Sequence, residues 1–348
     1  MFMKIGPVPE NLVECLLWAA GVIPTPLIDT FQAIIRARAI MAGSKLGVFD
    51  ALADGPATAD AVAQRIGADP RATGKLLSAL TGAGYLHWKK DRYQLARVAR
   101  KWLLSNCPSS LHDNMLHRYL EWDIAGHFED FVKTGKALDV HQDFPAHKWS
   151  IYLNGMRSLS GLSAGEVARR LPVPAGARTM LDLGGAHGYY SVALCRRYPD
   201  LSATIIDLPD AVQVAAPILV RENMGARVVH LAADVLTADL GAEQVDLVFI
   251  SQLLHHFDAD TNRRLIGKVA RALRPGGIVA ILEIIRPRSP RSAGQTGALL
   301  DLFFAVTSLS GTWSQADLAG WQKEAGLQPH KPIQLRTIPG GCIQAATK

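Results

Sequence analysis

From Arg178 onward the chain alternates short apolar runs with helical segments, and this alternation is the feature that most constrains its fold. It is typical of a parallel, doubly wound sheet with helices on both faces. We therefore expect a Rossmann-like α/β domain, with a tight turn at residues 274–277 leading into its fifth strand. The predicted strands are 179–183, 203–207, 227–231, 245–250 and 277–285, and the predicted helices are 189–197, 209–223 and 261–273.

The first third of the chain has a different pattern, in which helical segments are followed by one short hairpin. Apolar residues at helical spacing predict helices within 31–52, 59–66 and 71–83, and residues 85–95 alternate as in a hairpin. Helix, turn, helix and hairpin follow one another in winged-helix order. The helix at 71–83 stands where a winged helix has its recognition helix. It carries only Arg71 and Lys75 as basic residues, so we expect it to pack against protein rather than bind nucleic acid.

These patterns predict two domains, a winged-helix-like dimerisation domain over 1–110 and a unit of linker helices and sheet over 111–348. The 348 residues are 49% hydrophobic and 20% charged, a composition typical of folded domains. The net charge of +6 is spread along the chain, which indicates a solvated surface rather than a nucleic-acid partner. The apolar stretch Leu12–Ile23 is too short for a membrane span and predicts an amphipathic helix that buries its apolar face, with a partner subunit as one candidate surface.

The four cysteines lie far apart in the sequence and form no metal-binding or disulfide pattern. We therefore expect reduced thiols in a cytoplasmic protein without a metal site. The cysteines are Cys15, Cys107, Cys195 and Cys342.

A glycine-rich turn follows the first predicted strand and predicts a binding site for a nucleoside-containing cofactor. Asp182 precedes Gly184, Gly185 and Gly188, and a helix follows at once. Glycines at the carboxyl end of a strand allow close approach to a ligand, and the helix N-terminus offers free N–H groups. Asp207 ends the next strand 23 residues after Gly184, a distance that suits a carboxylate accepting the ribose hydroxyls.

The sequence of this turn distinguishes between a dinucleotide and S-adenosylmethionine (SAM) as the cofactor. The dinucleotide pattern G-x-G-x-x-G fails, because Ala186 and Tyr189 occupy two of its glycine positions. The observed D-x-G-x-x-x-G is the SAM pattern of class I methyltransferases. The sequence therefore predicts SAM as cofactor and S-adenosylhomocysteine as its product.

At this point the chain resembles the dimeric small-molecule O-methyltransferases, which include plant caffeate and flavonoid enzymes, acetylserotonin methyltransferase and bacterial natural-product enzymes. The resemblance covers nearly the whole chain and implies a homodimer formed through the N-terminal domain. It also implies that Asp207 binds the ribose, that Asp234 approaches the adenine, and that the three glycines surround the methionine end. Leu208, Val235 and Ser251 complete the predicted cofactor site. The matching stretches are, in order, LDLGGAHG, IIDLPD, AADVL, LLHHFDAD, PGGIVAILEIIRP and DLFFAVTS.

The resemblance places His255 at the family's general base, and the chemistry of imidazole suits this role. An imidazole titrates near neutral pH and can take a proton from a hydroxyl during methyl transfer. Glu283 stands where the family has an acid that orients the histidine, and an acid in an apolar strand needs a partner. Two departures weaken this arrangement: Thr312 replaces the family's second acid, and Ser251 replaces a common lysine.

The substrate site is predicted from apolar and aromatic residues near the bridge between the domains and after the fifth strand. Such a lining favours a flat, weakly charged acceptor with a hydroxyl group. Carbon methylation or another SAM-dependent reaction on the same fold is the alternative, and a SAM-responsive winged-helix regulator is a third possibility. A regulator requires an exposed basic helix face, whereas an enzyme requires a closed apolar cavity, which the sequence favours. The predicted substrate residues are Trp122, Phe128, Trp149, Met156, His256, Phe303, Phe304 and Ser308.

Overall fold

The computed structural model describes residues 5–138, 140 and 145–348, and its internal contacts group into two compact units. One unit runs through Tyr119 and the other from Leu120 to Lys348, so the division falls inside α8 (His112–Ala125). In the part of the chain that the structure describes, no helix has the length and apolar character of a membrane span.

The N-terminal unit is built from helices and one hairpin around its own apolar core. The side chain of Thr58 caps α5 by accepting from the backbone N–H of Ala61, and Pro70 begins α6, as the sequence predicts. Phe49, Leu77 and Leu80 are buried at the centre. The predicted order of elements is present, and the winged-helix assignment itself stays a prediction. The elements are α1 (Leu12–Ala19), α2 (Thr25–Leu27), η1 (Ile28–Gln32), α3 (Ala33–Lys45), α4 (Val48–Ala51), α5 (Ala59–Ile66), α6 (Pro70–Gly82), β1 (Leu86–Lys89), β2 (Arg92–Leu95) and α7 (Arg97–Trp102).

The C-terminal unit is a doubly wound α/β sheet, which confirms the predicted fold class. Its strands lie in the order β5-β4-β3-β6-β7-β10-β8, and β9 pairs with β10. The strands are β3 (Thr179–Leu183), β4 (Ser202–Asp207), β5 (Val228–Ala232), β6 (Val245–Ser251), β7 (Leu273–Ile284), β8 (Gln328–Pro329), β9 (Ile333–Gln334) and β10 (Gly341–Thr347). The helices are α9 (Phe128–Thr134), α10 (Ala146–Ser160), α11 (Ala164–Arg170), α12 (Tyr189–Arg197), α13 (Pro209–Val220), η2 (Gly225–Arg227), η3 (Leu254–His256), α14 (Ala259–Ala272), α15 (Pro290–Thr307) and α16 (Gln315–Glu324).

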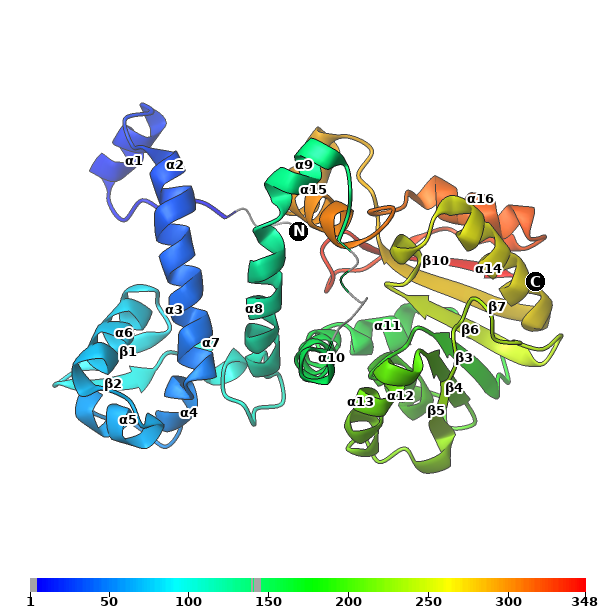
Figure 1. Cartoon of the computed structure of the whole chain (residues 1–348), viewed down its shortest axis with the longest axis horizontal. Coiled ribbons are helices and arrows are strands. Elements are labelled where there is room, and N and C mark those ends of the chain that lie inside the picture. The colour runs from blue at the N-terminus through cyan, green and yellow to red at the C-terminus, as the bar shows by residue number, and fades with distance from the viewer. Residues whose placement is uncertain (1–4, 139, 141–144) are drawn as a thin grey trace. The chain divides into compact units, whose positions relative to one another are not determined.

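Helices cover both faces of the sheet, and alternate residues of each strand face two separate cores. In β6, Leu247 and Phe249 pack with α11 and α12, whereas Val248 and Ile250 pack with α14 and α16. Figure 1 shows α14 and α16 on one side of the sheet and α12 and α13 on the other. Burial on both faces explains why the parallel strands are nearly continuous apolar runs.

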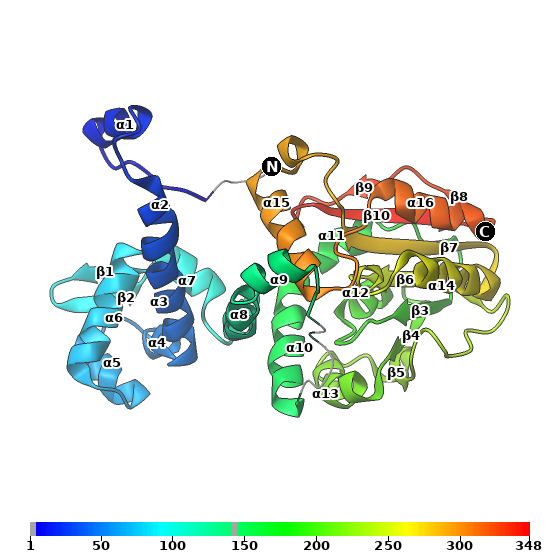
Figure 2. The same ribbon diagram turned by 45° about the horizontal axis from the view of Figure 1, so that its top comes forward.

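Two details of the sheet differ from the sequence prediction. β7 begins at Leu273 rather than residue 277, because Leu273 already pairs with Val245 and the ladder resumes at Leu247 with Ile278. The predicted turn at 274–277 is therefore a bulged stretch within the strand. The strands after β7, namely β8, β9 and β10, were not predicted, and β10 pairs antiparallel with β7 over seven residues, beside it in Figure 2.

Candidate active site

At each of the three glycines in the turn after β3, an added Cβ would lie less than 3 Å from a neighbouring side chain. A Cβ on Gly185 would lie 2.5 Å from the carboxyl carbon of Asp182. A Cβ on Gly188 would lie 2.4 Å from Cδ1 of Ile205, and Gly188 has a φ of +70°. The turn therefore presents bare backbone at the carboxyl end of the sheet, which fits a closely approaching cofactor.

Asp207 holds the glycine turn from the neighbouring strand. Its Oδ2 accepts from the backbone N–H of Ala186 at 2.8 Å, and its Oδ1 accepts from that of Leu208 at 2.8 Å. The parallel register of β3 and β4 brings the two strand ends together. Burial raises the pKa of Asp207 and outweighs the two backbone hydrogen bonds that lower it.

Asp182 lies buried beneath the same turn. Its Oδ2 accepts from the hydroxyl of Ser191 at 2.6 Å, and its Oδ1 has no hydrogen-bond partner among the described residues. Burial raises the pKa of this carboxyl group to about 7, against the lowering effect of the Ser191 hydrogen bond. The loop thus contains a carboxyl group whose charge the free protein stabilises poorly.

His187 is a buried residue of the turn that the sequence analysis did not single out. Its Nδ1 accepts from the backbone N–H of Tyr189 at 3.1 Å, so the neutral ring carries its proton on Nε2, which donates to the Ser160 hydroxyl at 3.2 Å. Burial lowers its pKa to about 3 and keeps the ring neutral. Ser160 belongs to α10, so His187 connects the glycine turn to that helix.

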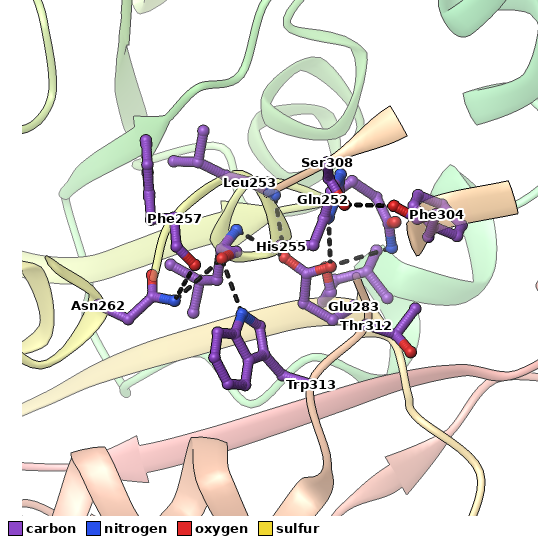
Figure 3. A network of polar contacts seen from close by, with 12 residues as sticks. Gln252, Leu253, His255, Phe257, Asn262, Glu283, Phe304, Ser308, Thr312 and Trp313 are labelled. Carbon is purple, nitrogen blue, oxygen red and sulfur yellow. Dashed lines mark hydrogen bonds and ion pairs between the residues drawn. The ribbon is translucent and has the colours of Figure 1, made fainter. Parts of the chain in front are cut away.

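The predicted catalytic pair is brought together at the end of β6. His255 lies in η3, and its Nδ1 is 2.9 Å from Oε2 of Glu283 on β7 (Figure 3). The other oxygen of Glu283 accepts from the backbone N–H groups of Leu253 and Leu254 at 2.9 and 2.8 Å. Both side chains are almost fully buried. The ring of Phe304 lies edge-on to that of His255, with centroids 4.9 Å apart.

A cavity of about 390 Å³ lies in the C-terminal unit beside the turn and η3. Six of the predicted site residues line it: Gly184, Asp207, Leu208, Trp149, His256 and Ser308. The remaining wall is formed by Ala137, Leu138, Tyr152, Leu153, Ala186, Ala211, Gln252, Leu253, Phe257, Thr307 and Leu309. Trp149, Tyr152 and Leu153 share one face of α10, and this helical spacing is the signal that would have indicated the latter two.

The other predicted residues lie outside this wall. Trp122, Phe128, Met156 and Phe303 do not line the cavity, and Phe304 contacts His255 instead. Asp182, Gly185, Gly188, Asp234, Val235, Ser251, His255 and Glu283 also lie outside the wall.

The predicted adenine end of the site lies after β5. One carboxylate oxygen of Asp234 accepts from the backbone N–H of Leu236 at 2.8 Å. Val235 is buried in the core with the sheet, so its side chain belongs to the packing of this corner. Ser251 is half-buried as the last residue of β6.

Thr312, which stands where the family's second acid is expected, makes a different contact. Its hydroxyl donates to the carboxylate of Asp301 on α15 rather than to His255. The segment around Thr312 is nevertheless close to η3, because the indole N–H of Trp313 donates to the carbonyl of Leu254 at 2.9 Å. Within the described residues no cluster of three or more His, Cys, Asp or Glu side chains is placed to bind a metal ion.

Known proteins match both units of the chain. The O-methyltransferase domain family matches residues 133–328, and the O-methyltransferase dimerisation domain family matches residues 28–105. The chain is 27% identical to 3-hydroxy-5-methyl-1-naphthoate 3-O-methyltransferase of Streptomyces sahachiroi, over 93% of this chain and 95% of that enzyme.

Two solved structures share the fold. A putative O-methyltransferase of Nostoc punctiforme superposes with a TM-score of 0.82 at 22% identity, covering 94% of this chain and all of that one. Human N-acetylserotonin methyltransferase in complex with SAM superposes with a TM-score of 0.80 at 18% identity, covering 97% and 98%. With a family match over more than half of its length, the chain belongs to the SAM-dependent O-methyltransferases.

Proposed function

We propose that the protein transfers a methyl group from SAM to a hydroxyl group of a small, mainly aromatic acceptor, with His255 as general base. The observation that carries this proposal is the buried pair of His255 and Glu283, at the same sheet edge as the glycine turn and Asp207. A carboxylate only accepts hydrogen bonds, so Glu283 places the imidazole proton on Nδ1. Nε2 of His255 then has a free lone pair and can accept a proton.

The residues at the glycine turn fit SAM. The turn offers bare backbone where a Cβ would clash, and Asp207 presents a carboxylate to the cavity wall. We place the ribose at Asp207 and Leu208, the adenine near Asp234 and Val235, and the methionine end at Gly184, Gly185 and Gly188, with Asp182 and Ser251 beside it. When bound, SAM supplies a methyl group on a strongly electrophilic sulfonium.

The task left to the protein is to position the acceptor and remove its proton. Nε2 of His255 takes the hydroxyl proton as the new bond between oxygen and the methyl carbon forms and the sulfonium's bond to that carbon breaks. The imidazolium is then stabilised by Glu283 at 2.9 Å. Exclusion of water from this buried pair strengthens that attraction.

The cavity wall favours an uncharged acceptor that donates hydrogen bonds. The hydroxyl of Thr307 donates to the Phe303 carbonyl at 3.0 Å, and that of Ser308 to the Phe304 carbonyl at 2.5 Å. Both hydroxyl protons are therefore used within α15, and only oxygen lone pairs remain for a ligand. No Lys or Arg is among the described residues that line the cavity.

Aromatic wall residues and one relative support an aromatic acceptor. Trp149 and Tyr152 form one side of the cavity, with ring centroids 6.0 Å apart. The similar enzyme of Streptomyces sahachiroi is named for a hydroxylated naphthoate. We propose a hydroxylated ring system without a fixed charge. We also propose a cytoplasmic homodimer formed through the N-terminal unit, acting on a small molecule and on no nucleic acid.

The test measures SAM binding and methyl transfer in three variants, with a panel of hydroxylated naphthalenes and phenols as acceptors. His255→Ala should lower the rate of methyl transfer by about 10²–10⁴-fold and leave the Kd for SAM nearly unchanged. Asp207→Ala should instead weaken SAM binding by about 1.5–3 kcal/mol, as for lost hydrogen bonds to a charged group. Calorimetry gives the affinities, and single-turnover kinetics give the rates.

His256→Ala is the matched control, because His256 is the adjacent imidazole and lines the cavity. Its ring centroid is 4.2 Å from that of His255. A larger rate loss in His256→Ala than in His255→Ala would indicate that His256 is the general base. Methylation of carbon rather than oxygen by the native protein would contradict the proposed reaction.

A further inference from the structure

The carbonyl of Leu254, directly before His255, accepts three hydrogen bonds. The indole N–H of Trp313 and the side-chain amide of Asn262 each donate to it at 2.9 Å, and the backbone N–H of Phe257 donates at 3.2 Å. A carbonyl oxygen has two lone pairs, so three donors exceed its usual complement. Figure 3 shows that the side chains of Trp313 and Asn262 come from separate segments of the chain.

Asn262 donates to the Leu254 carbonyl from a position that leaves its own side-chain oxygen unpaired within the described part of the chain. It is fully buried in α14, and its Nδ2 also donates to the Phe257 carbonyl at 3.2 Å. Because both neighbours are carbonyl oxygens, the amide cannot be turned around. Its own Oδ1 is left without a hydrogen-bond partner among the described residues. A buried oxygen left unpaired in this way usually has a specific reason, and here the residue fixes the backbone of η3.

Trp313 is itself held firmly. Its carbonyl accepts from the backbone N–H of Arg286 at 2.8 Å, and its ring meets that of Trp321 edge-on, with centroids 4.9 Å apart. From the same segment, the N–H of Ser310 donates to the His255 carbonyl at 3.4 Å. Residues 310–313 therefore support η3 through its backbone, whereas Thr312 contacts Asp301.

We propose that Trp313 and Asn262 are positioning residues for His255. Glu283 fixes the imidazole ring and the N–H groups of Leu253 and Leu254. Trp313 and Asn262 fix the next peptide unit of the same turn through the Leu254 carbonyl. This inference rests on the proposed role of His255 as base. A misplacement of about 1 Å at a reacting group can cost about 100-fold in rate, so a fixed turn matters for the chemistry.

Trp313→Phe removes the indole N–H and keeps an aromatic ring against Trp321. We expect it to lower kcat about tenfold, the effect of one lost neutral hydrogen bond, with KM for SAM unchanged. Trp321→Phe is the matched control, because it changes the other ring of the same contact without touching the Leu254 carbonyl. Trp321→Phe should keep kcat within about twofold of the native value. In combination with Glu283→Gln, the loss from Trp313→Phe should be non-additive, because both changes release the same turn.

Amide hydrogen exchange tests the same proposal without any turnover. The N–H groups of Leu253 and Leu254 should exchange faster in Trp313→Phe than in the native protein, and at the native rate in Trp321→Phe. Faster exchange confined to Trp313→Phe supports the positioning role even in a preparation that methylates none of the acceptors, a result that would count against the proposed function alone. Native exchange and native kcat in Trp313→Phe, or equal losses in both tryptophan variants, would overturn the proposal.

Discussion

At the scale of a single residue, Asp182 makes the free energy of unfolding depend on pH. Burial raises its pKa from 3.8 to about 7, so the folded protein keeps a proton that the unfolded chain releases near pH 4. A group that binds its proton more tightly in the folded state loses stabilising effect as the pH rises. The free energy of unfolding should therefore fall between about pH 4 and pH 7.

Asp182→Asn should remove this dependence, because an amide does not titrate. Between pH 5 and pH 8 the native protein should lose about 2–3 kcal/mol of unfolding free energy relative to Asp182→Asn. Urea unfolding at the two pH values measures the difference. Asp200→Asn, at an exposed position, should keep the native slope. Identical pH profiles for the native protein and Asp182→Asn would show that Asp182 titrates normally.

Single residues also show which contacts of the site could be predicted from the sequence and which could not. The pairing of His255 with Glu283 was predictable, because an acid in an apolar strand needs a partner and both strand ends meet at one sheet edge. Asn262 and Trp313 were not, because their contacts are with a backbone carbonyl, which leaves no pattern in the sequence. His187 was missed for the same reason: its partners are a backbone N–H and a serine 27 positions away.

At the scale of elements, the turn from β3 into α12 depends on its glycines. Gly188→Ala should destabilise the protein by about 2–4 kcal/mol, because it combines a left-handed φ with a Cβ 2.4 Å from Ile205. Gly267→Ala provides the contrast, since Gly267 lies inside α14 with no atom within 4 Å of its added Cβ. That substitution should stabilise the protein by about 0.5–1 kcal/mol. Thermal and urea unfolding of both variants would show whether their effects differ in sign.

The parallel strands could be predicted because both of their faces are buried, which leaves continuous runs of Val, Ile and Leu. β10 could not, because its sequence GCIQAAT has mainly small residues and a glutamine, with little intrinsic preference for a strand. Its conformation is imposed by pairing with β7, a contact between distant parts of the chain. The bulge at the start of β7 was hidden similarly, since Pro275 and Gly276 are typical of turns.

At the scale of the whole molecule, α1 carries an apolar surface that the single chain leaves uncovered. Leu12 and Leu16 are 75% and 63% exposed, and α1 buries none of its residues. Because residues 28–105 match the O-methyltransferase dimerisation domain family, we expect light scattering to give twice the mass of one chain, 37.6 kDa.

The double substitution Leu12→Asp with Leu16→Asp should shift the protein toward monomer at micromolar concentration. Val220→Asp is the control, because Val220 is equally exposed, at 74%, but ends α13 in the C-terminal unit. A native protein that is monomeric at these concentrations would contradict the proposed dimer. A shift caused equally by Val220→Asp would indicate a general effect of added charge.

Because β10 pairs with β7, the sheet can be completed only after residues 341–347 have been synthesised. β8 pairs with no strand of the described chain except β10, and β10 alone covers the edge of β7. On the ribosome, β3 to β7 emerge first and leave the edge of β7 open until residues 341–347 have left the exit tunnel. An open edge of that length is a template for pairing with a neighbouring nascent chain. Released products truncated between residues 285 and 340 should therefore be prone to aggregate, whereas released chains that contain residues 341–347 can close the sheet.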